Sequence, residues 1–316
     1  RMNASADTPL LGASQSALVE ERARGQLQIF WRRFRRHKLA MASAVYLVIL
    51  ILVAIFAPVI APHDPYKNDL QLARFGRPAA PSLEHPFGSD QLGRDQLSRI
   101  IYGARVSLMV GFVATGLAIV AGTLLGALAG YAGKWTDMVI MRMADVLLAF
   151  PPLLFSMAAL AAFDTSKRGV IHIAAVLGVI GWMNVARLVR GEFLILRTRE
   201  YTEAARAVGA SGGSIIMREL LPNAVGPIIV AATLGIPAAI LTESALSFLG
   251  FGIQPPEPSW GNMISGSGSN TFAMMRDFNA WWMGLFPGLA IATTVLAFNF
   301  FGDGLRDALD PRTVLD

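Results

Sequence analysis

The sequence contains no cysteine and few charged residues. Without a thiol among its 316 residues, the chain cannot form a disulfide scaffold, a thiolate metal site or a cysteine nucleophile. Only 16% of the residues are charged, against roughly 25% in an average soluble domain, whereas 54% are hydrophobic. Together with a mean hydropathy of +0.50, this composition argues against a soluble enzyme.

Motifs for hydrolytic chemistry are also missing. A pump that hydrolyses its own nucleotide needs a glycine-rich phosphate loop ending in Lys and Ser or Thr. The nearest match, Gly130-Tyr131-Ala132-Gly133-Lys134-Trp135, has neither the spacing nor the hydroxyl. A serine hydrolase needs a G-x-S-x-G elbow with a His and a carboxylate in reach, and Gly266-Ser267-Gly268-Ser269 does not fit that frame. We expect no metal site either, because no H-x-x-x-H pair occurs among the four histidines, His37, His63, His85 and His172.

Long apolar runs take the place of catalytic motifs. A helix needs about 20 apolar residues to cross a hydrocarbon layer. Six segments without Asp, Glu, Lys or Arg reach or approach this length: 39–61, 106–133, 146–163, 169–186, 220–242 and 278–302. The sequence therefore predicts an all-α membrane protein with six transmembrane helices, which together form one domain over residues 39–316.

The basic residues indicate how these spans are oriented. The chain carries a formal net charge of +5, but its Lys and Arg lie between apolar runs rather than on one solvated face, so we expect no nucleic-acid partner. Placing the N-terminus in the cytoplasm puts 18 Lys and Arg on the cytoplasmic side and nine on the other. By the positive-inside rule, both termini are predicted to be cytoplasmic.

Three segments lie outside the spans. Residues 1–16 are small and polar, which predicts a disordered cytoplasmic tail. Residues 17–38 interleave aromatic and basic side chains, as in an amphipathic helix at the lipid headgroups, although a simple basic stop before the first span remains an alternative. The proline-rich segment 62–104 is expected to be an ordered extracytoplasmic loop with little regular structure before about Asp90.

Several features within the spans predict packing. Gly122, Gly126 and Gly130 recur every four residues, so they lie on one helical face that another backbone can approach. Pro151-Pro152 should kink the third span, either as a packing bend or to shape a pathway. Arg142 and Asp145 lie three positions apart and are expected to form an ion pair on one helical face.

Glu243 is a carboxylate deep in the fifth span, and Ser244, Ser247 and Phe248 follow it. A charge within a span is costly, so Glu243 should face the helix bundle or a conduit rather than lipid. Glu243, Ser247 and Phe248 are therefore candidate conduit or gate residues. Whether Glu243 bonds locally or meets a substrate stays open at this point.

The cytoplasmic loop 190–222 carries the most informative pattern. The Ala-rich segment 200–208 favours a helix, Gly209 suits a left-handed exit, and Ser214 is a candidate cap for a second short helix that Pro222 separates from the next span. Small side chains on the first helix would let a cleft of another protein close around it, with Glu203 and Arg206 as polar anchors. An ordinary surface loop is the alternative.

The same loop resembles a known family. Glu203-Ala204-Ala205, then Gly209 and the terminal Leu221-Pro222, are similar to the E-A-A-x(3)-G-x(n)-L-P signature of permease subunits of ATP-binding-cassette (ABC) importers. Further segments resemble the C-type branch of oligopeptide and dipeptide permeases: 31–36 (WRRFRR), 85–95 (HPFGSDQLGRD), 246–256 (LSFLGFGIQPP) and 302–311 (GDGLRDALDP). The resemblance covers roughly positions 30 to 312, and the first thirty residues depart from it.

The resemblance implies a type I ABC importer permease bundle in the bacterial inner membrane that takes up di- or oligopeptides. Its implied partners, besides membrane lipid, are a second, B-type permease, two ATPase subunits and an extracytoplasmic solute-binding protein. The resemblance also implies that ATP and magnesium bind only to the ATPase subunits, so that this chain holds no cofactor and performs no catalysis. The implied ATPase-coupling residues are Glu203, Ala204, Ala205, Arg206, Gly209, Leu221 and Pro222.

Other solutes and two other classes of membrane protein are alternatives to a peptide importer. The same branch is associated with nickel, glutathione and some sugars, so the solute stays open. An ion-coupled secondary transporter would need intramembrane carboxylates, of which only Glu243 and Asp145 are available, and often an internal repeat that this chain does not display. A structural or assembly subunit would not require the cytoplasmic helix pair.

Overall fold

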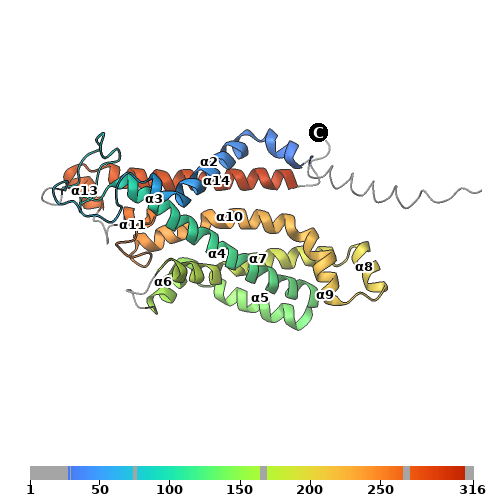
Figure 1. Ribbon diagram of the computed structural model, residues 1–316. Coiled ribbons are helices and arrows are strands. Elements are labelled where there is room, and N and C mark those ends of the chain that lie inside the picture. The colour runs from blue at the N-terminus through green and yellow to red at the C-terminus, as the bar shows by residue number, and fades with distance from the viewer. Residues whose placement is uncertain (1–27, 29, 74–76, 164–168, 266–270, 310–316) are drawn as a thin grey trace, which may run out of the picture.

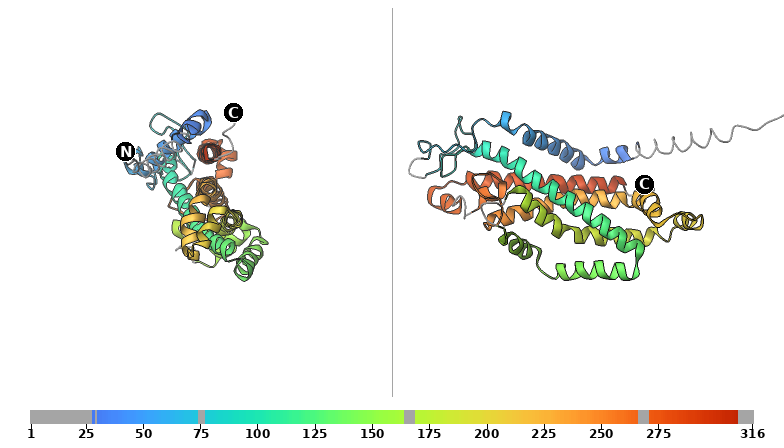
Figure 2. Two further views of the ribbon diagram at one scale, coloured as in Figure 1. Left: turned by 90° about the vertical axis from the view of Figure 1, so that its right-hand side faces the viewer. Right: turned by 60° about the horizontal axis from the view of Figure 1, so that its bottom comes forward.

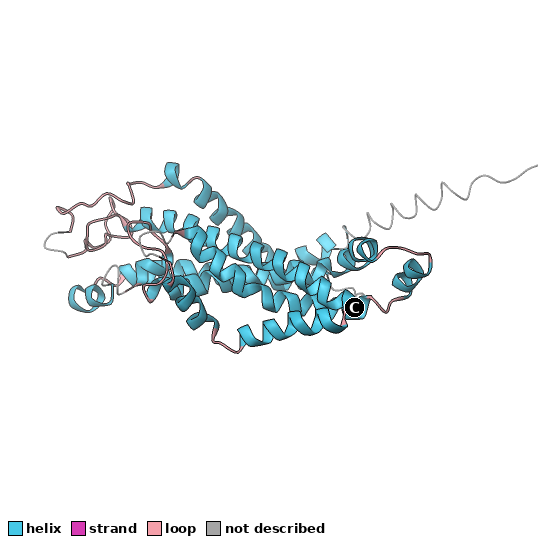
Figure 3. Cartoon of the chain, turned by 90° about the horizontal axis from the view of Figure 1, so that it is seen from below, coloured by secondary structure: helices cyan, strands magenta, loops and turns pink. Residues whose placement is uncertain are grey.

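The structure is a computed structural model that describes residues 28, 30–73, 77–163, 169–265 and 271–309. Over these residues, the regular elements are helices, and the one ladder contact is an isolated bridge between Ser89 and Asp95. Figure 3 shows the helices packed lengthwise into one elongated bundle. The prediction of an all-α protein is therefore confirmed for the described part of the chain.

Five described helices are long and apolar enough to cross a membrane, and a bent helix pair makes a sixth span if the pair counts as one. The five are α2 (Lys38–Ile55), α4 (Gln96–Ala132), α7 (Val170–Leu196), α10 (Leu221–Phe248) and α14 (Trp282–Leu309). The bent pair is α5 (Lys134–Leu148) and α6 (Pro152–Ala161). Six spans in these places agree with the sequence, apart from their ends.

Short helices gather at the two ends of the bundle (Figures 1 and 2). At one end lie α3 (Ala57–Ile60), α11 (Trp260–Ile264) and α13 (Thr271–Phe278). At the other end lie α8 (Glu200–Ala207), α9 (Gly212–Ile215) and the π-helical turn η3 (Ile216–Leu220). The start of α2 and the end of α14 lie at the α8 end, as expected if both termini share one side of the membrane with the 190–222 loop (Figure 1).

The third span begins earlier than predicted. Its first half, α5, starts at Lys134 rather than Val146, and α5 and α6 meet at an angle of 86° across the break before Pro152. The predicted kink is confirmed. The predicted ion pair between Arg142 and Asp145 is wrong, because Asp145 instead bonds Arg187 of α7 at 2.5 Å. Pairing across to α7 explains why charged residues can stand in α5.

The last part of the predicted extracytoplasmic loop 62–104 is helical. The helix α4 begins at Gln96, not at Val106, because Asp95 caps it by accepting a hydrogen bond from the Ser98 amide at 2.8 Å. Before Asp95 the backbone is irregular, as predicted. It is ordered by a buried ion pair between Arg94 and Asp90 (2.6 Å) and by the Trp282 indole, which donates to the Ser89 carbonyl.

The described part of the segment before the first span packs against the C-terminal helix. Residues 30–36 are helical, and the helix breaks at His37 rather than after Lys38. Phe34 is buried and meets the Phe301 ring edge-on at 5.6 Å, whereas Trp31 is half exposed. Residues 1–27, which include the predicted tail and the first half of the predicted interfacial helix, lie outside the described residues.

The glycine face of α4 packs against α7, and these two helices share the most extensive helix contact in the described chain. A Cβ atom on Gly122 would come within 2.5 Å of Val185, and one on Gly126 within 2.5 Å of the Ala186 carbonyl oxygen. A Cβ atom on Gly130 would come within 2.6 Å of Phe193. Only glycine allows this approach, so the predicted packing role is confirmed.

We expect the natural absence of cysteine to make the topology directly measurable. Leu83 and Val208 are almost fully exposed at opposite ends of the bundle. In spheroplasts, a membrane-impermeant maleimide should label Leu83→Cys at once and Val208→Cys only after permeabilisation. Labelling of both variants in intact spheroplasts would contradict the assigned orientation.

We expect Gly126→Val to destabilise the bundle by about 1–3 kcal/mol, because the added methyl groups overpack the α7 backbone. Thermal unfolding of the purified chain in detergent measures the effect as a lower Tm. Gly116→Val is the matched control, since no atom lies within 4 Å of a Cβ built there. Equal Tm values for the two variants would argue against close packing of α4 on α7.

Candidate functional site

The helix α8 extends beyond the end of the bundle (Figures 1 and 2). Glu203, Ala204 and Arg206 are exposed, and Ala205 is half-buried. The exposed face thus offers an acid, a base and a small side chain within one helical turn. Such a face suits insertion into a cleft of another protein, as the sequence predicts.

Both ends of α8 are fixed by specific bonds. Near its start, the fully buried Thr202 donates from Oγ1 to the Leu196 carbonyl at 2.9 Å, which ties α8 to the last turn of α7. At its end, the Gly209 amide donates to Arg206 and the Ala210 amide donates to Ala205. This is the Schellman pattern, in which Gly209 adopts φ +82°. The predicted left-handed exit at Gly209 is confirmed.

The second half of the loop differs from the prediction in two respects. The cap of α9 is Ser211, whose side chain accepts from the Ser214 amide, and not Ser214 itself. Pro222 does not separate a short helix from the next span, because α9, η3 and α10 run on as one apolar rod. Pro222 lies just after η3, and the π turn there accommodates the backbone donor that proline lacks.

A small apolar cluster supports α8 from below. Half-buried Ala205 and Ala210 pack against a core that α7 supplies with Val189 and Phe193. Leu221 joins the same cluster, whereas Pro222 is exposed. The rest of the core comes from α4, α9, η3 and α10: Ala127, Ile215, Leu220 and Ala224. The cluster therefore connects α8 to α4, α7 and α10 through direct side-chain packing.

Polar contacts strengthen the same end of the bundle. Arg190 of α7 binds Asp137 of α5 through two bonds, of which the one from Nη2 to Oδ2 measures 2.6 Å. The Arg197 guanidinium donates to the Gly130 carbonyl near the end of α4 at 3.1 Å. Charged hydrogen bonds of this kind are stronger than neutral ones, so they hold α4, α5 and α7 in register below α8.

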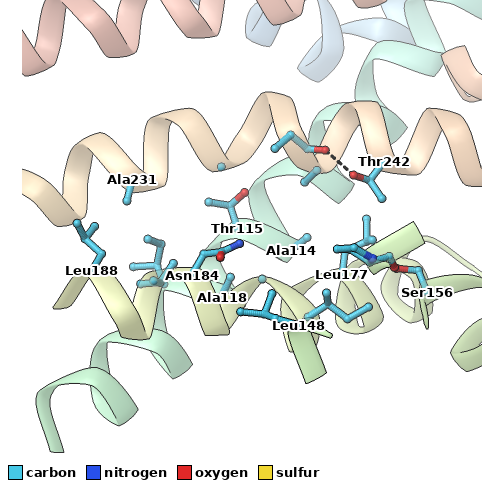
Figure 4. Close-up of a pocket in the computed structure, with 18 residues that line it drawn as sticks. Ala114, Thr115, Ala118, Leu148, Ser156, Leu177, Asn184, Leu188, Ala231 and Thr242 are labelled. Carbon is cyan, nitrogen blue, oxygen red and sulfur yellow. Dashed lines mark hydrogen bonds between the residues drawn. The ribbon is translucent and has the colours of Figure 1, made fainter. Parts of the chain in front are cut away.

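A cavity of about 310 Å³ lies between α4, α6, α7 and α10 (Figure 4). Its walls are mostly apolar, and its polar groups are Thr115, Ser156, Asn184 and Thr242. The Thr115 hydroxyl is buried and makes no hydrogen bond within the described part of the chain. A buried hydroxyl without a partner costs free energy, so Thr115 is a polar group of the cavity wall whose bonding is incomplete in this structure.

Glu243 lies near the other end of α10 and forms a local polar cluster. Its side chain is fully buried. Its Oε1 accepts a 2.7 Å bond from Ser247, and its Oε2 accepts a longer bond, 3.4 Å, from Ser107 of α4. Ser247 Oγ in turn accepts from the Ile253 amide in the loop after α10. The prediction that Glu243 faces the bundle is confirmed.

The predicted candidates do not form one site. The helix α8 lies at one end of the bundle, and the last turns of α10, which carry Glu243 and Ser247, lie toward the other end (Figure 1). Phe248 is 40% exposed, and the cavity wall includes Thr242 but not Glu243. Sequence reasoning missed Thr115 and Asn184. The only feature of the sequence that could have identified them is a polar side chain inside a charge-free apolar run, and this feature is a weak indicator of a cavity.

Two family models match the chain. Residues 122–315 match the model of the family described as binding-protein-dependent transport system inner membrane component. Residues 25–81 match the N-terminal transmembrane domain of oligopeptide transport permease C. Together the two matches cover the chain from residue 25 to residue 315, apart from residues 82–121.

Curated relatives are similar over most of their length. The dipeptide transport system permease protein DppC of Alkalihalophilus pseudofirmus is 43% identical over 284 residues, which cover 89% of this chain and 88% of the relative. The glutathione transport system permease protein GsiD of Escherichia coli is 44% identical over 283 residues, covering 90% and 89%. A solved structure, described as an amino acid ABC transporter with histidines, shares the fold with a TM-score of 0.50 at 14% identity, covering 66% of this chain and 94% of that one.

We expect Gly209→Val to loosen α8, because a β-branched residue at φ +82° costs roughly 1–2 kcal/mol. Amide hydrogen exchange of α8 should then accelerate about 5–30-fold. Gly209→Asn should change it much less, since Asn tolerates the left-handed region. Gly213→Val is the control, because Gly213 has open space and no positive φ. Equal exchange in all three variants would contradict the fixed exit of α8.

Proposed function

Because the chain belongs to the family of binding-protein-dependent transport system inner membrane components, we propose that it works with ATPase subunits to import di- and oligopeptides. It is a multi-pass permease of the bacterial inner membrane. The observation that carries the proposal is α8, a short exposed helix fixed to the end of α7 and reaching out of the bundle.

The proposed partners follow from the surfaces that one bundle leaves open. The exposed face of α8 (Glu203, Ala204, Arg206) is the dock for one of two ATPase subunits. A second, B-type permease completes the conduit, because α4, α6, α7 and α10 enclose the cavity only in part. An extracytoplasmic binding protein delivers the solute to the end of the bundle opposite α8. ATP and magnesium bind to the ATPase subunits, and this chain itself holds no cofactor for ATP hydrolysis.

Transport depends on movement of helices in this chain rather than on a covalent reaction. Closure of the paired ATPases displaces α8, and the apolar cluster beneath it passes the displacement to α4, α7 and α10. These helices form the cavity walls, so their relative movement opens the cavity to one side of the membrane and closes it to the other. Gly209, Leu221 and Pro222 serve this step by fixing the loop. Glu243 and Ser247 hold the loop after α10 against α4 at the extracytoplasmic end.

A peptide substrate suits the cavity. Its polar lining consists of hydroxyls and one amide, with no charged side chain among the described lining residues. Such groups can bond the donors and acceptors of a peptide backbone and tolerate many side chains. A free nickel ion would instead require imidazole or carboxylate ligands. The 44% identity to a glutathione permease makes glutathione, itself a small peptide, the second candidate solute.

The test is uptake into proteoliposomes that contain the complex recovered with this chain. A labelled dipeptide and labelled glutathione are supplied with the binding protein, with ATP on the α8 side and every ion gradient collapsed. ATP-dependent accumulation supports the proposal, and the faster solute identifies the substrate. Accumulation that follows an ion gradient without ATP would instead establish a secondary transporter.

We expect Glu203→Lys to reduce ATP-dependent uptake at least about tenfold, which corresponds to losing roughly 1.4 kcal/mol at the α8 dock. ATP hydrolysis should also respond less to the loaded binding protein, because the site is remote from the cavity. The control is Asp307→Lys, the same charge reversal at an exposed position in the last turns of α14. Unchanged uptake by an assembled Glu203→Lys complex would show that α8 is an ordinary surface helix.

A further inference from the structure

The loop before α4 brings together two histidines that lie far apart in the sequence. The rings of His63 and His85 stack with centroids 4.4 Å apart. Glu84 lies beside them, and one ligand atom from each of His63, Glu84 and His85 falls within 4.8 Å of the other two. This cluster lies at the end of the bundle opposite α8 and is not used in the transport mechanism.

The buried carboxylate of Asp95 lies next to the Nδ1 atoms of both imidazole rings. Its Oδ1 lies 2.9 Å from Nδ1 of His85 and 3.8 Å from Nδ1 of His63. A carboxylate only accepts hydrogen bonds, so Nδ1 of His85 carries the proton and its Nε2 keeps a free lone pair. A carboxylate behind a histidine is the arrangement that prepares imidazole for a metal, because it fixes both the tautomer and the ring orientation.

The backbone around the cluster is held as firmly as the rings. The other Asp95 oxygen accepts bonds from the amide and hydroxyl of Ser98, at 2.8 and 2.6 Å. The Ser98 hydroxyl in turn accepts from the His63 amide at 3.0 Å. His85 sits in a tight turn, with its amide bonded to the Ser82 hydroxyl and its carbonyl accepting from the Ser82 and Gly88 amides. The cluster is therefore preorganised.

His63 contributes a second observation. Its Nδ1 is buried and makes no hydrogen bond within the described residues, although the side chain as a whole is 35% exposed. The accessible part of the ring is therefore the side away from Asp95. Glu84 is also exposed, so its carboxylate can rotate toward the two rings. Two imidazoles and one carboxylate thus converge where solvent, and a dissolved ion, can reach them.

We propose that His63, Glu84 and His85 bind one divalent transition cation, with Zn²⁺ the best match. Two imidazoles and a carboxylate are a known three-ligand set for Zn²⁺, which leaves the fourth position to water. Ligand atoms around tetrahedral Zn²⁺ stand about 3.4 Å apart. The three ligand atoms, all within 4.8 Å of one another, must therefore move closer, and the stacked rings must tilt so that both lone pairs point at the ion. Ni²⁺ and Cu²⁺ compete for the same ligands by their general affinity order.

The cation would act as a clamp on the first extracytoplasmic loop. It joins the chain just after α3 to the turn before α4, and Asp95, which stands behind it, is also the cap of α4. This proposal departs from the sequence-based expectation of no metal site, because His63 and His85 form no H-x-x-x-H pair and meet only through the fold of the loop. The site is independent of the proposed transport function, since its ligands lie within this chain and its binding is measured without transport.

The test is a Zn²⁺ titration of the full-length chain, purified in detergent with any subunits that accompany it and stripped with chelator. We expect one equivalent of Zn²⁺ to bind with a Kd below about 10 μM. Co²⁺ should give the visible absorption of a four-coordinate site. Glu84→Gln should weaken binding at least about tenfold, and His63→Ala at least about 100-fold.

His172→Gln is the matched control, since His172 is a histidine of the same bundle end outside the cluster. Its Zn²⁺ affinity should equal that of the unmodified chain. If His63→Ala does not fold, Glu84→Gln decides alone, because Glu84 is exposed in a turn. A wild-type Kd above about 100 μM, or an affinity unchanged by Glu84→Gln, would overturn the proposal.

Discussion

The close approach of α4 and α7 is the constraint on which the rest of the structure depends. Three glycines on one face of α4 let its backbone approach α7 at distances that no other residue would allow. In a membrane, where apolar side chains gain little by leaving lipid, such backbone contact is the main source of helix association. We refer to α4 and α7 in this arrangement as the α4–α7 scaffold.

The α4–α7 scaffold connects the two functional regions. At one end, α7 carries α8 through the bond from Thr202 to Leu196, and ion pairs attach α5 to preceding turns of α7. In the middle, Thr115 of α4 and Asn184 of α7 line the cavity (Figure 4). A stiff scaffold transmits a movement of α8 to the cavity walls, whereas a soft one would absorb the movement locally.

The sequence predicted the features that depend on local pattern. Charge-free runs located the spans, and the glycine repeat identified the packed face. A carboxylate in an apolar run predicted that Glu243 faces inward, but not that Ser107, from a different helix, would bond it. The third span was placed too far along the chain because its first half carries charges, and their partners on α7 are visible only in the fold.

The remaining differences between the sequence-based predictions and the structure also arise from contacts between residues that are far apart in the chain. Either Ser211 or Ser214 could cap α9, and the choice depends on where the chain leaves the Gly209 turn. His63 and His85 meet because an irregular loop folds back on itself, and no periodic pattern encodes such a path. Thr115 becomes notable only once the structure shows its hydroxyl buried beside a cavity without a partner. Long-range contacts decide each of these outcomes.

The central claim is that α8 moves as one body with the α4–α7 scaffold. Spin labels at Val208→Cys, just after α8, and Ile171→Cys, at the far end of α7, test it in the assembled transporter. Both positions are exposed, and α7, whose 27 residues span about 40 Å, lies between them in the chain. We predict one narrow distance distribution by double electron–electron resonance, unchanged between nucleotide-free and ATP-trapped complexes. A distribution that broadens or shifts by several ångströms on trapping would contradict the claim, because α8 would then move independently of the scaffold.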